Sequence, residues 1–158
     1  MPLTADIVES WRRPRVVVRR LIVRGASEPL VFSFLLAFLA LALAAVAPGL
    51  ARQAWLEGGT PLLPRLYASG LGLLATIPLW YLLAALGHLA ARAFGGKGSY
   101  QGGRLALFWS LLVTAPAMLV QGLVLGMVGA GLATSLLGVA VGMGFLIFWG
   151  LALRAVES

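Results

Sequence analysis

The chain has 158 residues, of which 61% are hydrophobic and only 11% are charged. A soluble domain is roughly half apolar and about a quarter charged, so this composition excludes an ordinary soluble protein and predicts a membrane protein. The net charge of +7 does not indicate nucleic acid, because half of the Lys and Arg residues precede the first apolar segment. With no Cys and a single His, thiolate and multi-His metal sites are excluded as well, and no cofactor is expected.

Residues 1–28 form a basic leader ahead of the first apolar segment. Pro14 divides it into two short helical pieces, because proline cannot continue a helix. After Pro14, helical spacing places apolar side chains such as Val17, Val18 and Leu21 on one half of the helix and arginines on the other. We therefore expect an amphipathic interfacial helix in the headgroup layer that binds anionic lipid, the alternative being that its arginines only set the topology. The arginines concerned are Arg12, Arg13, Arg15, Arg19, Arg20 and Arg24.

Three segments free of charged residues follow the leader. They lie between Glu28 and Arg52, between Arg65 and Arg92, and from Leu105 to Leu153. Since a helix needs about 20 apolar residues to cross a hydrocarbon core of about 30 Å, the third segment holds two spans, with a glycine-rich turn near residues 126–131. The sequence thus predicts an all-α polytopic membrane protein, a four-helix transmembrane bundle preceded by an amphipathic interfacial helix.

The predicted organisation has three parts. The leader covers residues 1–28, the bundle residues 29–153, and a cytoplasmic tail residues 154–158, with spans at about 29–48, 66–92, 103–128 and 132–153. The first span is expected to end at Pro48 and Gly49, since this pair interrupts helices.

Orientation follows from the distribution of Lys and Arg. Ten of the twelve fall on the side of the leader, the loop after the second span and the tail, whereas Arg52 and Arg65 fall on the other side. Because positive side chains in short loops stay in the cytoplasm, both termini are expected to be cytoplasmic. The large excess of Arg over Lys, with abundant Ala, Leu and Gly, indicates a GC-rich bacterial genome and hence a bacterial inner membrane.

The loop after the second span contains a glycine-rich turn formed by Gly95, Gly96, Lys97, Gly98 and Ser99. Its spacing does not match a phosphate-binding loop. We expect Gly95 and Gly96 to adopt a positive φ at the helix end, and Ser99 to cap the next helix. His88, just before this turn, is the one His of the chain, and the segment free of charged residues in which it lies offers it no acidic partner, so no enzyme is expected.

The third and fourth spans contain polar and small residues at helical spacing. Ser110, Thr114 and Gln121 lie near one face of the third span, where they either line a solute path or tie helices together. Small-residue pairs allow close approach of two backbones, either between spans three and four or between two chains. These pairs are Gly122 with Gly126 and Gly138 with Gly142.

Residues 88–100, from His88 through the Gly-Gly-Lys-Gly-Ser turn to Tyr100, resemble the bacterial branch of the Yip family of Ypt/Rab-interacting membrane proteins. The resemblance implies a multi-span helical membrane protein without enzymatic activity. Eukaryotic members bind small GTPases in vesicle trafficking, but their Asp-Leu-Tyr signature is absent here, so that function is not carried over. The family usually has five spans, whereas four are predicted here. Lys97 and its turn are carried over as a structural and partner-facing element.

The expected function is non-enzymatic. A Yip-like inner-membrane protein would bind or organise lipid or another membrane component, with anionic headgroups and a membrane-protein partner or a second copy of the chain as partners. Two alternatives remain: an accessory subunit of a larger inner-membrane complex, and a small channel that uses His88 and the polar face of the third span.

Overall fold

Residues 3–157 of the computed structural model form seven helices and no strand. Four segments are long and apolar enough to cross a membrane, which confirms the all-α polytopic fold. The leader contains α1 (Leu3–Ser10) and α2 (Pro14–Val23), and the spans are α3 (Glu28–Leu56), α4 (Leu62–Ala75) with α5 (Ile77–Ala93), α6 (Tyr100–Val128) and α7 (Leu132–Glu157).

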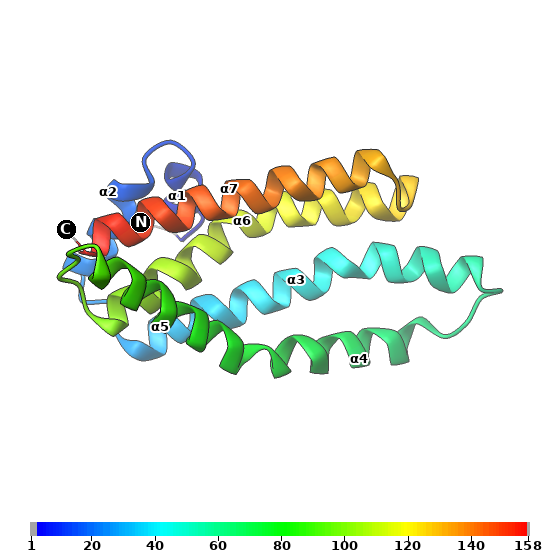
Figure 1. Ribbon diagram of the computed structural model, residues 1–158. Coiled ribbons are helices and arrows are strands. Elements are labelled where there is room, and N and C mark those ends of the chain that lie inside the picture. The colour runs from blue at the N-terminus through cyan, green and yellow to red at the C-terminus, as the bar shows by residue number, and fades with distance from the viewer. Residues whose placement is uncertain (1–2, 158) are drawn as a thin grey trace.

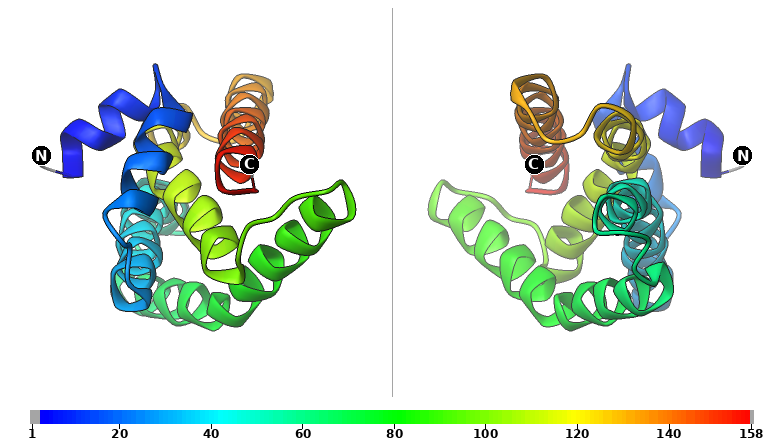
Figure 2. Two further views of the ribbon diagram at one scale, coloured as in Figure 1. Left: turned by 90° about the vertical axis from the view of Figure 1, so that its left-hand side faces the viewer. Right: turned by 90° about the vertical axis from the view of Figure 1, so that its right-hand side faces the viewer.

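The spans form two long hairpins, one made of α3, α4 and α5 and the other of α6 and α7 (Figure 1). The leader, the turn between α5 and α6 and the end of α7 lie together at one end of the molecule, which we call the basic end. The connections from α3 to α4 and from α6 to α7 lie at the opposite end, which we call the loop end. Seen along the bundle, the helices form an open arc (Figure 2), and within the described residues α4 and α7 make no contact.

The two hairpins meet mainly along a seam between α3 and α6, and small residues form the part of this seam nearest the loop end. A Cβ added at Gly122 would overlap the carbonyl oxygen of Ala45, and one added at Gly126 would lie 2.5 Å from the Cβ of Pro48. Both glycines therefore let α6 approach the backbone of α3. Their partner is the first span, whereas the sequence suggested the fourth span or a second chain.

Gly138 and Gly142 of α7 behave differently. A Cβ at Gly138 would lie 2.8 Å from the amide nitrogen of Gln121 on α6, so this glycine leaves room for that side chain. A Cβ at Gly142 would have no neighbour within 4 Å. Gly142 therefore borders open space within the described residues.

Helix α3 does not end at Pro48 and Gly49, and that expectation was wrong. The helix continues through Pro48 to Leu56. The extension places Arg52 beside the end of α6, where its guanidinium donates to the carbonyl oxygens of Gly126 (3.4 Å) and Met127 (3.0 Å). Because the last carbonyls of a helix lack partners within it, these bonds favour continuation of α3 over the local preference of proline.

The second span is not one continuous helix, because α4 ends at Ala75 and α5 begins at Ile77. Pro78 in the first turn of α5 cannot donate a backbone hydrogen bond, which accounts for the interruption. At the break, the indole nitrogen of Trp80 donates to the hydroxyl oxygen of Thr76 (2.9 Å), and the ring of Trp80 packs edge-on against Phe38 of α3. The contact between Trp80 and Phe38 holds the interrupted second span against α3.

Candidate functional site

The leader is packed onto the bundle. Val17 and Val18 on α2 are fully buried and Leu21 is 5% exposed, because α7 and α6 cover this face of the helix. A free interfacial helix would instead bury its apolar face in lipid. The sequence predicted the two-faced helix, and the structure covers its apolar face with protein.

Helix α1 is held against α2 by charge. The guanidinium of Arg20 donates to the carboxylates of Asp6 and Glu9, at 2.9 Å in each case, and Arg24 lies 3.6 Å from Asp6. The hydrogen bond from Arg20 lowers the pKa of Glu9 below its ordinary value of 4.5. Both acidic residues of α1 are therefore engaged by α2.

Helix α1 also contacts the spans directly. The indole nitrogen of Trp109 on α6 donates to the hydroxyl oxygen of Ser10 (3.1 Å), and both side chains are buried. Next to it, Trp11 packs edge-on against Phe148 of α7, with ring centroids 5.1 Å apart. These contacts, together with those of α2, fix the leader on the transmembrane helices.

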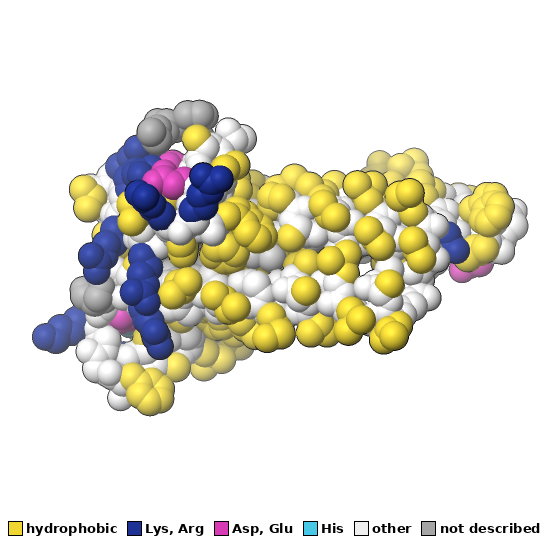
Figure 3. Space-filling model, turned by 90° about the horizontal axis from the view of Figure 1, so that it is seen from above, with side chains coloured by type: hydrophobic (Ala, Val, Ile, Leu, Met, Phe, Trp, Pro, Cys, Tyr) yellow, Lys and Arg dark blue, Asp and Glu magenta, His cyan; other side chains and the backbone are white. Residues whose placement is uncertain are grey.

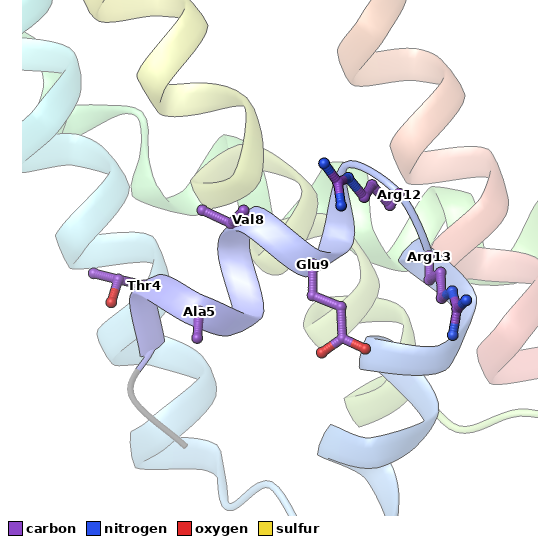
Figure 4. Close-up of a pocket in the computed structure, with 6 residues that line it drawn as sticks. All are labelled: Thr4, Ala5, Val8, Glu9, Arg12 and Arg13. Atoms are coloured by element: carbon purple, nitrogen blue, oxygen red, sulfur yellow. The ribbon is translucent and has the colours of Figure 1, made fainter.

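The docked leader presents a band of arginines at the basic end (Figure 3). Five of its six arginines are exposed, and the sixth, Arg20, is half-buried in its ion pairs. Arg12 and Arg15 form no ion pair within residues 3–157. An open pocket of about 620 Å³ lies along α1 and the turn that follows it (Figure 4), and its lining residues are Thr4, Ala5, Val8, Glu9, Arg12 and Arg13.

The pocket is lined by two arginines that follow one another in the sequence, Arg12 and Arg13, and by the hydroxyl-bearing side chain of Thr4 at the other end of α1. The carboxylate of Glu9 is already bonded to Arg20, so part of its charge is compensated. Guanidinium groups bind phosphate oxygens through two parallel hydrogen bonds. The lining of the pocket thus includes two side chains of the type that binds phosphate oxygens.

A second cluster at the basic end joins α5, the turn and the end of α7. The ring nitrogen Nδ1 of His88 donates to one carboxylate oxygen of Glu157 (2.6 Å), and the backbone N–H of Gly98 donates to the other (2.7 Å). The backbone N–H of Lys97 donates to the carbonyl oxygen of Glu157 (3.1 Å). The His88 and Glu157 side chains are 1% and 6% exposed. We call the group His88, Lys97, Gly98 and Glu157 the C-terminal clasp.

Sequence reasoning missed the acidic partner of His88. Glu157 follows the last apolar segment, so a search for acidic residues within the spans does not find it. The available signal was that the second and last spans are both predicted to end on the same side of the membrane, which brings His88 and Glu157 to the same depth. The ring of His88 also packs against Tyr100, with centroids 4.5 Å apart, which closes the other side of the clasp.

The glycine-rich turn is shaped around Glu157. Gly95 has the expected positive φ, at 91°, and the hydroxyl of Ser99 accepts from the backbone N–H of Gly102 and caps α6. Gly96 does not have a positive φ, so that part of the expectation was wrong. A Cβ at Gly96 would lie 2.5 Å from a carboxylate oxygen of Glu157, so Gly96 is required for close packing. Lys97 is exposed between these glycines.

The polar face of the third span is mostly used within the helix itself. The hydroxyl groups of Ser110 and Thr114 donate to the carbonyl oxygens of Ala106 (2.7 Å) and Ser110 (2.8 Å), and both side chains are buried. Gln121 is half-buried and forms no hydrogen bond within the described part of the chain. The three residues therefore do not form one continuous row of available donors.

Comparison with known proteins identifies the chain. The family model for the Yip1 domain matches residues 8–156, which include most of the leader and all four spans. No curated protein and no solved structure matches the chain. Since the family model covers nearly the whole length, the protein is a multi-pass membrane protein that belongs to the Yip1 family.

Proposed function

We propose that the protein binds anionic lipid headgroups through the arginines of its leader and thereby organises lipid around the bundle, without chemistry of its own. The observation that carries this proposal is the docking of α2 on α6 and α7, which gathers the exposed arginines in one band. Lys97 and Arg154 lie at the same end and are exposed. Each Arg near an anionic leaflet contributes about 1 kcal/mol of attraction.

The proposed location is a bacterial inner membrane, with the basic end in the cytoplasm. This orientation places ten of the twelve Lys and Arg residues on the cytoplasmic side. It also places the arginine band beside the headgroups of the inner leaflet, where the anionic lipids of the proposal would bind.

Replacing Arg12, Arg13 and Arg15 together by glutamine is expected to lower the preference of the full-length protein for phosphatidylglycerol over phosphatidylcholine at least about tenfold. Three charges contribute about 3 kcal/mol in total, and each 1.4 kcal/mol is a factor of ten, before screening by salt. Native mass spectrometry of the protein in mixed micelles of the two lipids measures the preference. The triple lysine variant keeps the charge and is expected to retain most of it.

Two outcomes contradict the headgroup proposal. One is an equal preference for the two lipids in the unmodified protein. The other is a glutamine variant that keeps the full preference, in which case the arginines would only set the topology.

The orientation can be tested by labelling single introduced cysteines, because the sequence itself contains no Cys that would react. Lys97→Cys in the turn at the basic end is expected to react with a membrane-impermeant maleimide only after the inner membrane is opened. Gly131→Cys at the loop end, where a Cβ meets no neighbour within 4 Å, is expected to react in cells with only the outer membrane permeabilised. The reverse pattern would place the basic end in the periplasm and contradict the proposed orientation.

A further inference from the structure

A lateral groove opens between the two hairpins, away from the basic end and its arginines. It has a volume of about 400 Å³ and is bordered by α3, the break between α4 and α5, α6 and α7. We define the groove by six of its lining residues: Phe38, Leu73, Trp80, Gln121, Gly142 and Phe145. Most of these side chains are apolar, and they come from elements that lie far apart in the sequence.

The groove faces lipid. Helices α4 and α7 flank it, make no contact with each other within residues 3–157, and lie apart when the bundle is viewed end-on (Figure 2). Both belong to spans in which only 6% of the most apolar stretch is buried inside the protein. Since these spans lie in a bilayer, the medium at the mouth of the groove is hydrocarbon.

The size of the groove determines what can occupy it. One turn of a helix with its side chains is about 5.4 Å long and at least about 10 Å wide, which already amounts to roughly 400 Å³. The groove therefore takes in about one turn of a helix and not a whole transmembrane helix, whereas a single flexible acyl chain can enter it from the side. If the groove were empty, the side chains that line it would lose dispersion contacts, so an occupied groove is favoured.

One polar group in the groove lacks a partner. The indole nitrogen of Trp80 donates to Thr76, and the hydroxyl of Thr114 donates to its own helix. Gln121 forms no hydrogen bond within the described residues, although the absence of a side chain at Gly138 leaves space for its amide. An amide without a partner in hydrocarbon is costly, so a ligand that supplies an acceptor is favoured.

The depth of Gln121 identifies this acceptor. It lies seven residues before Val128 at the end of α6, or about 10 Å along the helix axis. The 29 residues of α6 are about 43 Å long, so the helix extends about 7 Å beyond a 30 Å hydrocarbon core at each end. Gln121 is then a few ångströms inside the core boundary at the loop end, close to the glycerol esters of that leaflet.

We propose that the lateral groove binds one phospholipid from the leaflet at the loop end. Its acyl chain lies between the two hairpins against Trp80, Phe38 and Phe145. The amide of Gln121 donates a hydrogen bond to the carbonyl of its ester. This site is separate from the arginine band, and it recognises the chain and glycerol ester of the lipid and not the charge of its headgroup.

The test uses the full-length protein in phosphatidylcholine vesicles that contain a trace of phosphatidylcholine spin-labelled near the end of one acyl chain. A zwitterionic lipid is chosen so that attraction to the leader arginines does not contribute. Electron paramagnetic resonance counts the immobilised lipids per protein. Gly142→Leu places a side chain into the groove, and Gly144→Leu is the matched control, because a Cβ there also has no neighbour within 4 Å but Gly144 does not line the groove.

The expected result is the loss of one immobilised lipid per chain in Gly142→Leu and no loss in Gly144→Leu. Gln121→Leu is expected to keep the lipid but to exchange it several-fold faster, as the loss of one hydrogen bond predicts. Equal counts in the two glycine variants overturn the proposal. An unchanged exchange rate in Gln121→Leu overturns the assignment of the donor.

A second copy of the chain is the competing occupant. If Gly142→Cys forms disulfide-linked dimers in the vesicles while Gly144→Cys stays monomeric, the groove is a protein interface and the lipid proposal is overturned. Neither outcome bears on the headgroup proposal, because that proposal concerns the opposite end of the molecule and a different chemistry.

Discussion

Gly122→Ala is expected to reduce the free energy of unfolding by at least about 3 kcal/mol, the upper part of the range for overpacked positions. The added Cβ would overlap the carbonyl oxygen of Ala45, which is backbone and cannot rotate away. The α3 and α6 helices must then separate, and the seam that joins the two hairpins opens. Unfolding of the detergent-solubilised protein, followed by tryptophan fluorescence, measures the change.

Gly144→Ala is the matched control for this prediction. A Cβ at Gly144 meets nothing within 4 Å, and alanine is favoured over glycine inside a helix by about 1 kcal/mol, so the control is expected to unfold like the unmodified protein or at a slightly higher temperature. If Gly122→Ala unfolds together with Gly144→Ala, the close approach of α3 and α6 at Ala45 is wrong.

Removing either His88 or Glu157 from the C-terminal clasp is expected to lower the free energy of unfolding by about 3 kcal/mol. Each change leaves a buried charge or a buried ring nitrogen without its partner. His88→Phe removes the donor to the Glu157 carboxylate, and Glu157→Leu removes the acceptor for both His88 and the backbone N–H of Gly98. The double variant leaves neither side chain unpaired, so its loss of stability is expected to be smaller than the sum of the two single losses.

A double-mutant cycle measured by unfolding in detergent gives the coupling energy of His88 and Glu157. Glu157→Gln is the graded control, since its amide oxygen can still accept from His88 while its NH₂ group faces the N–H of Gly98. We expect its stability to lie between that of the unmodified protein and that of Glu157→Leu. Additive losses in the cycle would mean that the two side chains are close but not coupled.

The number and type of the spans could be predicted from the sequence because the thickness of the bilayer sets the length of an apolar segment independently of the fold. The end of α3 could not. Pro48 is a local signal for termination, and the bonds from Arg52 to the end of α6 that favour continuation join residues more than seventy positions apart. Long-range contacts of this kind are not visible in local sequence patterns.

The two clusters at the basic end show the same limit. Helical spacing predicted the two faces of α2, but lipid and protein interior are equally apolar, so the pattern did not indicate that α6 and α7 would cover Val17 and Val18. From the sequence, the need for glycine in the turn was attributed to a positive φ angle. This reason holds for Gly95, whereas Gly96 and Gly98 are needed for the approach of Glu157, a residue about sixty positions further along the chain.

The docking of the leader also bears on the thermodynamics of the proposed headgroup binding. A disordered basic arm loses backbone entropy when it settles on a membrane, about 1–2 kcal/mol for each residue that becomes ordered. In this protein α1 and α2 are already ordered, because Val17, Val18 and Ser10 are buried against the spans before any lipid arrives. In the proposed headgroup binding, the arginines would therefore meet the leaflet as a preorganised array, and ordering of the leader would offset little of their electrostatic attraction.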